Sequence, residues 1–371
     1  MKNCAFFPTM DQTLPIIRYI NACIDDLRIA YLLAYPGSGL VGHDGNRADL
    51  RGAVGSVYSD TEMLDLADWD TLIIAEYHLL ESAQADARLT QLINRALQSG
   101  KSVVCAKSLV ASDVDAFRRV ADMFKSEFCY LPRERIRRPK TRGSLEKLNS
   151  FYVGFGSMVN DTGALEAFLQ CSRILSKQLK VSLICTDDAA QLCGAHSFND
   201  IIQASITGAG KVYEMNRTAK EIEREEQPDI VLYNVSSPLL PFDDTIPNGF
   251  GIIPFLVSRA LPSNMFYGIV PYEYANRWFV EEFIHGIEGQ FGYETDGIIA
   301  SNTLIDTTTL VGSEAISTVY VDPRLMAKSL ERYKCDGSCI IYDVTSESDM
   351  QMISEDIFSS YKQKQSHKII P

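Results

Sequence analysis

The chain has 371 residues, with 35 Lys and Arg against 48 Asp and Glu, so its formal net charge is −13. This length favours two domains over one. The negative charge argues against nucleic acids and anionic membranes as partners, because both attract positive surfaces. No apolar run is long enough for a membrane span, and residues 1–8 are too short and weakly charged for a secretion signal. We therefore expect a cytoplasmic protein.

The first half of the chain alternates short apolar runs with amphipathic stretches. The pattern predicts, in order, a strand at 5–7, a helix at 15–23, strands at 28–34 and 71–75, a helix at 83–98, a strand at 102–106, a helix from an N-cap at Ser112 to about 125, and a strand at 128–131. Strands separated by helices indicate parallel βαβ units. We predict a Rossmann-like α/β domain over residues 1–132.

A basic stretch follows, RERIRRPKTR over residues 133–142. It has neither a helical nor a strand period, and we interpret residues 133–148 as a linker between domains. The alternative is a docking site for an acidic peptide or a phosphate, in which Arg135, Arg137 and Arg138 would make the contacts.

The second half repeats the same alternation. The pattern predicts strands at 151–155, 180–185, 229–235, 265–270, 317–321 and 339–343. It predicts helices at 164–177, 214–226, 251–260 and 277–287, and a helical segment after each of the last two strands. We therefore predict a second doubly wound α/β domain over residues 149–371.

A Gly-rich turn follows the first strand of this second domain, within residues 151–163 (FYVGFGSMVNDTG). A strand, such a turn and a helix N-terminus direct free backbone N–H groups at one point, which suits a phosphate. Gly154 and Gly156 permit a close backbone approach, and Asp161 and Thr162 fall where a P-loop has its Lys and its Ser/Thr. Because an acidic residue replaces that Lys, we interpret the turn as a degenerate P-loop. The alternative is a working nucleotide site.

A second Gly-rich loop, PGSGLVGHDGN over residues 36–46, follows the strand at 28–34. Ligands bind at this end of the strands in open α/β sheets. The candidate ligand-binding residues are Gly39, Gly42, His43 and Asp44. The loop contains GxGxxG, but no helix obviously begins there, so the dinucleotide fingerprint lacks its context. The alternative is a flexible turn without a ligand.

A third loop, over residues 236–250, is long enough to form the rim of a cleft, and Asp243 offers a carboxylate for a ligand. A divalent metal would need further oxygen ligands that the sequence does not identify, so we predict no metal and no cofactor. Cys335 and Cys339 form a CxxxC without a further ligand nearby, and we expect most of the nine cysteines to be reduced core thiols. We interpret His196 as a hydrogen-bonded loop residue rather than a catalytic one.

The order and spacing of several motifs resemble a family of peptide maturation system proteins, which occur beside radical SAM maturases of Cys-rich ribosomal peptides, mostly in clostridia. The matching segments are 7–8, 15–19, 39–44, 70–74, 100–105, 180–182, 198–199, 227–230, 248–252 and 291–296. The family usually has Lys at the position of His43. The resemblance spans nearly the whole chain, but its motifs are structural, and it implies no catalytic residue. It implies a role in making a modified peptide, with the precursor peptide and the radical SAM maturase as partners.

Two functions follow as hypotheses. The first is an accessory protein that binds the precursor peptide or the maturase, without turnover of its own, since no loop has a matched nucleophile, base and orienting group. The second is an α/β enzyme or ligand-binding protein that uses a phosphate-bearing small molecule at a Gly-rich loop at the end of a strand.

Overall fold

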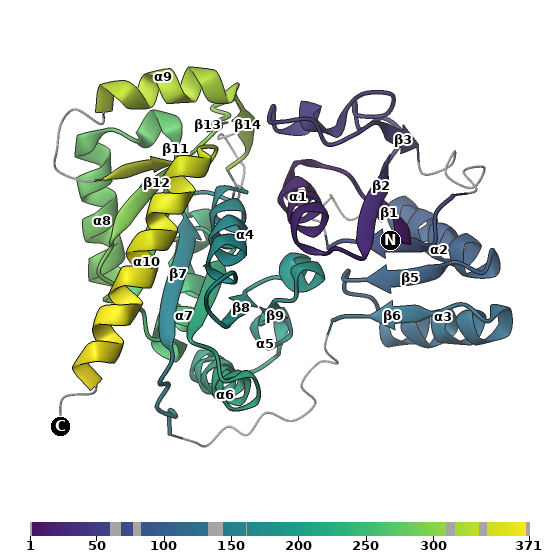
Figure 1. Cartoon of the computed structure of the whole chain (residues 1–371), viewed down its shortest axis with the longest axis horizontal. Helices are drawn as coiled ribbons and strands as arrows, with labels where there is room; N and C mark the ends of the chain where they lie inside the picture. Colours follow the sequence, from purple (N-terminus) through teal and green to yellow (C-terminus); the bar gives the residue numbers. More distant parts are fainter. Residues whose placement is uncertain are drawn as a thin grey trace. The chain divides into compact units, whose positions relative to one another are not determined.

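The computed structural model describes residues 2–59, 68–76, 83–132, 144–160, 162–308, 316–333 and 340–368. It divides into two compact units, each with its own parallel sheet (Figure 1). The first consists of Met1–Arg133 and Asp188–Gly194, and the second of Glu134–Asp187 and Ala195–Pro371. Residues 188–194, which the sequence pattern had assigned to the second domain, therefore belong to the first unit.

The first sheet has six parallel strands in the order β3-β2-β1-β4-β5-β6. They are β1 (Lys2–Phe7), β2 (Leu27–Ala34), β3 (Val57–Ser59), β4 (Thr71–Ile74), β5 (Ser102–Cys105) and β6 (Phe128–Tyr130). The order reverses between β1 and β4, as it does in dinucleotide-binding folds. The carboxyl ends of these two strands therefore mark the place where this fold type binds ligands.

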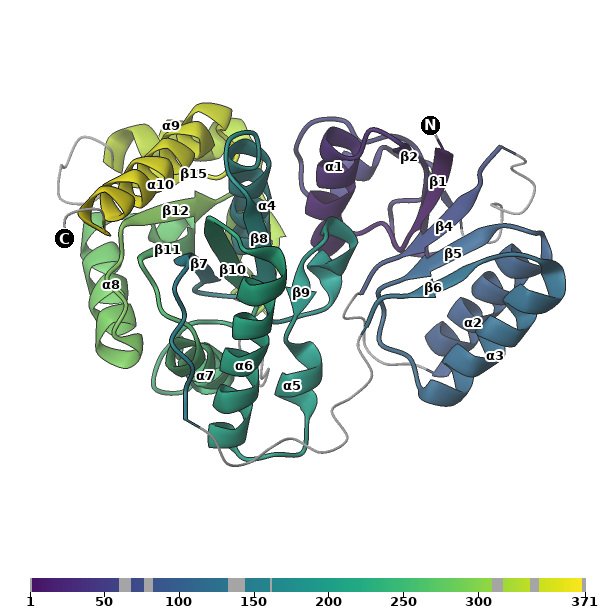
Figure 2. The ribbon, with the colours of Figure 1, turned by 60° about the horizontal axis from the view of Figure 1, so that its bottom comes forward.

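Within the described residues, the first sheet is covered by helices α1 (Leu14–Cys23), α2 (Ala83–Gln98) and α3 (Ala111–Phe124). Right-handed crossovers in opposite directions along the sheet place α1 on one face and α2 and α3 on the other (Figure 2). The core between the sheet and helices α2 and α3 includes Phe7, Leu72, Ile93 and Phe117. Helix α3 begins one residue before Ser112, and its N-cap is Val110, so Ser112 lies in the first turn and is not the cap.

The second sheet has seven strands in the order β15-β12-β11-β7-β10-β8-β9, all of them parallel. They are β7 (Phe151–Ser157), β8 (Val181–Cys185), β9 (His196–Ser197), β10 (Ile230–Val235), β11 (Met265–Pro271), β12 (Gly297–Ser301) and β15 (Ile341–Asp343). Every residue of β7, β10 and β11 is buried. Strands buried on both faces carry nearly continuous apolar runs, which is why these three are recognisable in the sequence.

The helices of the second unit are α4 (Gly163–Leu175), α5 (Asn199–Gln203), α6 (Gly208–Glu226), α7 (Ile252–Ala260), α8 (Arg277–Phe291), α9 (Pro323–Tyr333) and α10 (Glu347–Lys368). Helices α4 and α10 pack together on one face of the sheet (Figure 1). Helices α6, α7 and α8 cover the other face, where Met215, Val257 and Phe283 join a hydrophobic core cluster. A two-stranded antiparallel ribbon, β13 (Thr303–Ile305) with β14 (Thr318–Tyr320), follows β12.

The chain thus folds as two doubly wound α/β units. None of the described helices contains a segment both long and apolar enough to cross a bilayer.

Candidate functional site

The carboxyl ends of the parallel strands in the second sheet lie along one edge, and the turn between β7 and α4 lies there. Open α/β sheets bind ligands at this edge. Buried polar side chains stand at the ends of three of these strands: Ser157 in β7, Asn234 in β10 and Ser301 in β12. The sequence pattern predicted a strand, a turn and a helix here, and the structure has them.

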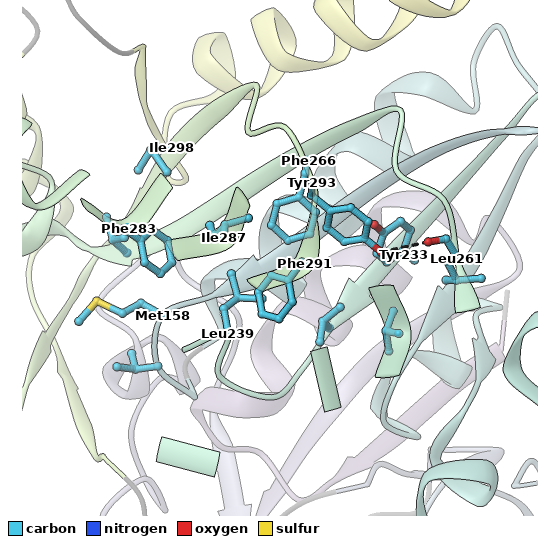
Figure 3. Close-up of a cluster of buried hydrophobic side chains, with 14 of the residues drawn as sticks. Met158, Tyr233, Leu239, Leu261, Phe266, Phe283, Ile287, Phe291, Tyr293 and Ile298 are labelled. Atoms are coloured by element: carbon cyan, nitrogen blue, oxygen red, sulfur yellow. Dashed lines mark hydrogen bonds between the residues drawn. The ribbon is translucent and has the colours of Figure 1, made fainter. Parts of the chain in front are cut away.

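Gly154 and Gly156 serve packing in this structure. Both belong to the buried strand β7 rather than to the turn. A Cβ atom at Gly154 would lie 2.4 Å from Cζ of Tyr233 and 2.6 Å from Cδ2 of Phe266, and one at Gly156 would lie 2.6 Å from Cδ2 of Leu239. Figure 3 shows these three side chains in the same buried cluster. Core side chains therefore occupy the space that the missing Cβ atoms of the two glycines leave.

Thr162 stands immediately before α4, where a P-loop has its Ser/Thr. In P-loop NTPases that hydroxyl binds Mg²⁺. Here the Oγ1 atom of Thr162 lies 2.7 Å from the hydroxyl of Tyr320, in β14. Asp161, which replaces the P-loop Lys, lies outside the described residues. Tyr320 could not be assigned to this turn from sequence, because the two hydrogen-bonded residues are 158 positions apart.

The strand next to β7 carries a neutral amide at this edge. Asn234 is 2% exposed, and its Nδ2 atom donates to the Ser236 hydroxyl at 3.2 Å, while its Oδ1 atom has no hydrogen-bond partner among the described residues. P-loop NTPases hold Mg²⁺ with an Asp in addition to the Ser/Thr. An amide cannot supply that negative charge, and this agrees with the missing Lys.

The loop after β2 contains three glycines in left-handed conformations, with φ of 85° at Gly37, 77° at Gly39 and 81° at Gly42. A short 3-10 helix, Gly45–Ala48, follows, and no α-helix begins there. This confirms the expectation that no α-helix follows the GxGxxG, as a dinucleotide fingerprint would require. The GxGxxG also follows β2, whereas the sheet order puts the ligand position at the end of β1.

Asp44 holds this loop together. One carboxylate oxygen accepts from the backbone N–H groups of Asn46 and Val54, at 2.9 and 3.0 Å, and the other accepts from that of Gly55 at 3.2 Å. Desolvation is the largest single influence on its pKa and acts to raise it. The three N–H donors and the positive charge of Arg18 together outweigh it, so the pKa of Asp44 lies below the ordinary value. These bonds assign Asp44 to the structure of the loop.

The same loop is tied to α1 by an ion pair. The guanidinium of Arg18 donates to both carboxylate oxygens of Asp49, at 2.5 and 3.0 Å, and Asp49 is 3% exposed. His43, in contrast, is exposed, and its imidazole makes no hydrogen bond to any residue that the structure describes. A ligand at this loop would therefore meet His43 and the open sides of Gly39 and Gly42, next to which no atom lies within 4 Å of a Cβ position.

The carboxylate of Asp243 accepts hydrogen bonds from two later residues of the same loop, Thr245 and Ile246. Its Oδ1 atom accepts from the hydroxyl and N–H of Thr245, both at 2.7 Å, and from the N–H of Ile246 at 2.8 Å. The Thr245 hydroxyl is the first cause of the lowered pKa of Asp243, and the two N–H groups follow. Within the described ranges, no group of three His, Cys, Asp or Glu side chains is arranged to hold a metal ion.

His196 belongs to a cluster that the sequence did not predict. Its Nε2 atom lies 2.5 Å from Oε1 of Glu226, at the end of α6, and Ser182 of β8 donates to the other oxygen of the same carboxylate. The pKa of Glu226 is lowered. Desolvation acts against this, but the bonds from Ser182 and His196 outweigh it. Because His and Ser bond the carboxylate and not one another, the arrangement fastens the edge strand β9 and does not form a nucleophile with its base. His196 is hydrogen-bonded, as expected, but lies in a short strand.

Most of the described cysteines are buried thiols. They are Cys4, Cys105, Cys171, Cys185 and Cys193, while Cys129 is half-buried and Cys23 exposed. Burial raises the pKa of Cys105 and Cys171 to about 12, so both stay protonated and unreactive. Cys335 and Cys339, and the basic residues Arg135, Arg137 and Arg138, lie outside the described residues.

Comparisons with known proteins match the fold. Neither protein-family models nor curated sequences match the chain. The chain is similar to the crystal structure of a DUF1611 family protein from Anabaena variabilis ATCC 29413, with 10% identity and a TM-score of 0.62, over 97% of this chain and 100% of that one. At this identity the likeness shows the fold alone.

Two further structures match over little more than half of the chain. One is a GTPase in its apo form from Pyrococcus abyssi, with 14% identity and a TM-score of 0.33, over 57% of this chain and 97% of that one. The other is the MinD cell division protein of Aquifex aeolicus, with 14% identity and a TM-score of 0.31, over 58% and 98%. Scores this low establish nothing further about this chain.

Proposed function

We propose that this chain is an accessory protein in the maturation of a ribosomally synthesised, Cys-rich peptide, and that it acts with a radical SAM maturase by binding its partners. The sequence resemblance supplies the process. The turn between β7 and α4 supports a role in binding partners rather than in nucleotide chemistry, because its groups already make contacts within the protein. The hydroxyl of Thr162 bonds Tyr320, and core side chains fill the space beside Gly154 and Gly156. The proposal places the protein in the cytoplasm, where free thiols persist.

The second candidate is an α/β protein that binds a phosphate-bearing small molecule. One observation favours it: Gly39 and Gly42, in the loop after the carboxyl end of β2, have open space beside them. Under this reading the loop is the site, and His43 is its exposed polar side chain.

A pull-down with purified components tests the first proposal. The full chain is immobilised and offered a radical SAM maturase and an unmodified Cys-rich precursor peptide, at low and high salt. We expect at least one of the two proteins to be retained. Retention of an acidic partner should fall as the salt concentration rises, because exposed charges are screened beyond about 8 Å at physiological ionic strength. Replacing Arg135, Arg137 and Arg138 with Ala should lower that retention.

Retention of neither protein under any condition would contradict the accessory role. In that event, calorimetry with a nucleotide or a sugar phosphate tests the second candidate, and the wild-type chain is compared with His43→Ala and Gly39→Val. Binding that both substitutions weaken would establish the loop after β2 as the site.

A further inference from the structure

A turn of left-handed backbone precedes α7. Four consecutive residues have positive φ: Asn248 (45°), Gly249 (73°), Phe250 (54°) and Gly251 (63°). An L-residue in this conformation costs about 1–2 kcal/mol, and Asn and Gly tolerate it far better than Phe. The turn therefore strains an aromatic residue for no local conformational gain. Backbone strain that the surrounding structure holds in place is typical of functional sites.

The surroundings of the turn hold it in place. The Nδ2 atom of the buried Asn248 donates to the carbonyls of Met158, at 2.8 Å, and Leu240, at 3.1 Å. Gly251 has no room for a side chain, since a Cβ atom would lie 2.3 Å from the carbonyl oxygen of Leu239. Gln290 of α8 donates to the carbonyl of Phe250 at 3.3 Å. The backbone of Phe250 is thus fixed from both sides.

The side chain of Phe250 is not used by the fold. It is 61% exposed, and Ile252 and Phe255 beside it are 58% and 41% exposed. The opposite side of α7 is also apolar, since Pro254, Val257 and Ala260 are buried. A helix that is apolar on its solvent face as well as on its core face indicates an interaction surface.

A cation, Arg259, borders this surface. Arg259 lies seven positions after Ile252 and four after Phe255, on the same exposed face of α7, and its guanidinium lies 4.8 Å from the centre of the Phe255 ring. It donates to the carbonyl of Gln290 at 3.1 Å, and no carboxylate of a described residue lies within ion-pair distance of it. In a chain with a net charge of −13, an unpaired Arg beside apolar side chains is complementary to an apolar segment that carries a carboxylate.

We propose that Phe250, Ile252, Phe255 and Arg259 form a docking surface for a peptide segment that presents apolar side chains next to a carboxylate. The inference rests on the proposed function, under which this segment belongs to the precursor peptide. Rigid aromatic side chains suit this purpose, because binding does not have to order them. The turn fixes the backbone that carries the Phe250 ring.

Fluorescence anisotropy of the labelled, unmodified precursor peptide tests the surface on the full-length protein. Phe250→Gly combined with Phe255→Ser should weaken binding at least roughly tenfold, as expected for the loss of two aromatic anchors. Arg259→Gln should weaken it less and make it less sensitive to salt. The matched control is Leu325→Ser, which removes an equally exposed apolar side chain, also 61%, from α9 of the same unit. Circular dichroism checks that each variant is folded.

The outcomes separate this inference from the function on which it rests. If the peptide binds the wild-type chain and the double variant equally well, or if the chain binds the maturase only, the docking surface is wrong and the accessory function stands. If the wild-type chain binds neither partner, both fail. A wild-type dimer in sedimentation that the double variant dissolves would show that a second copy covers the surface, which also overturns the inference.

Discussion

Single residues in this protein show how far a motif can depart from its expected use. Gly154 and Gly156 look like the glycines of a phosphate-binding turn, yet Tyr233, Phe266 and Leu239 pack against them. The sequence predicts the strand that carries these glycines, because its apolar run is continuous. It does not predict what faces them, since the packing partners come from β10, β11 and the loop after β10.

The packing role of Gly154 predicts a loss of stability on substitution. Gly154→Ala adds a Cβ atom 2.4 Å from the Tyr233 ring, in a core without room for it, and should lower the free energy of unfolding by about 1–3 kcal/mol in urea titrations. The control is Gly289→Ala on the exposed side of α8, where no atom lies within 4 Å of the new Cβ position. There the higher helix propensity of Ala should raise the free energy of unfolding by up to about 1 kcal/mol. Equal stability of both variants would argue against the packing role.

The depressed pKa of Asp44 predicts a pH-dependent contribution to stability. A carboxyl whose pKa is lower in the folded than in the unfolded state, where it is about 3.9, stabilises the fold above that value, and the contribution is lost as the pH falls through the folded pKa. Asp44→Asn should therefore be less stable than wild type at pH 7, and the difference should shrink towards pH 3. A difference that is constant over this range would mean that the charge of Asp44 does not matter.

Among the larger elements, the sequence pattern identified most strands and helices but not all of them. It missed β12 (Gly297–Ser301), whose five residues form a short run with small side chains, and a short apolar run is an ambiguous signal. It began α6 near residue 214, whereas the helix begins at Gly208 after an N-cap at Thr207, whose hydroxyl accepts from Gly210 N–H at 3.1 Å. The two glycines in that first turn conceal the capping signal.

The left-handed turn before α7 was also beyond prediction. Asn-Gly-Phe-Gly indicates a turn, but positive φ at Phe250 depends on the buried bonds of Asn248 and on the contact of Gly251 with Leu239. Only the folded structure brings these groups together.

Alanine substitutions in this turn should lower stability by different amounts at Gly249 and at Gly251. Gly249→Ala, with no atom within 4 Å of the new Cβ, should lose only the cost of a left-handed Ala, about 1 kcal/mol. Gly251→Ala should lose clearly more, because its Cβ atom would lie 2.3 Å from a backbone oxygen. Chemical denaturation of the two variants measures the difference, and equal losses would contradict the tight contact at Gly251.

For the molecule as a whole, the sequence predicted two doubly wound α/β units, and the structure has them. It could not predict that residues 188–194 belong to the first unit, because no local pattern marks a segment that packs outside its own domain.

The accessory role predicts that the protein has no use for nucleotides. ATP and GTP should not bind at the turn between β7 and α4, where Asp161 replaces the P-loop Lys and Tyr320 bonds the Thr162 hydroxyl. Isothermal titration calorimetry checks this, with Thr162→Val as the comparison, because Thr162 is half-buried in the turn itself. Micromolar affinity for ATP that this substitution abolishes would contradict the account of the turn.

Mass spectrometry of the precursor peptide tests the central claim most directly. The peptide is co-expressed with the maturase, with this protein, with both and with neither. The accessory role predicts no modification with this protein alone, and more modified peptide with both proteins than with the maturase alone. If this protein alone modifies the peptide, or if it leaves the yield of modified peptide unchanged, the claim that it supports maturation by binding is wrong.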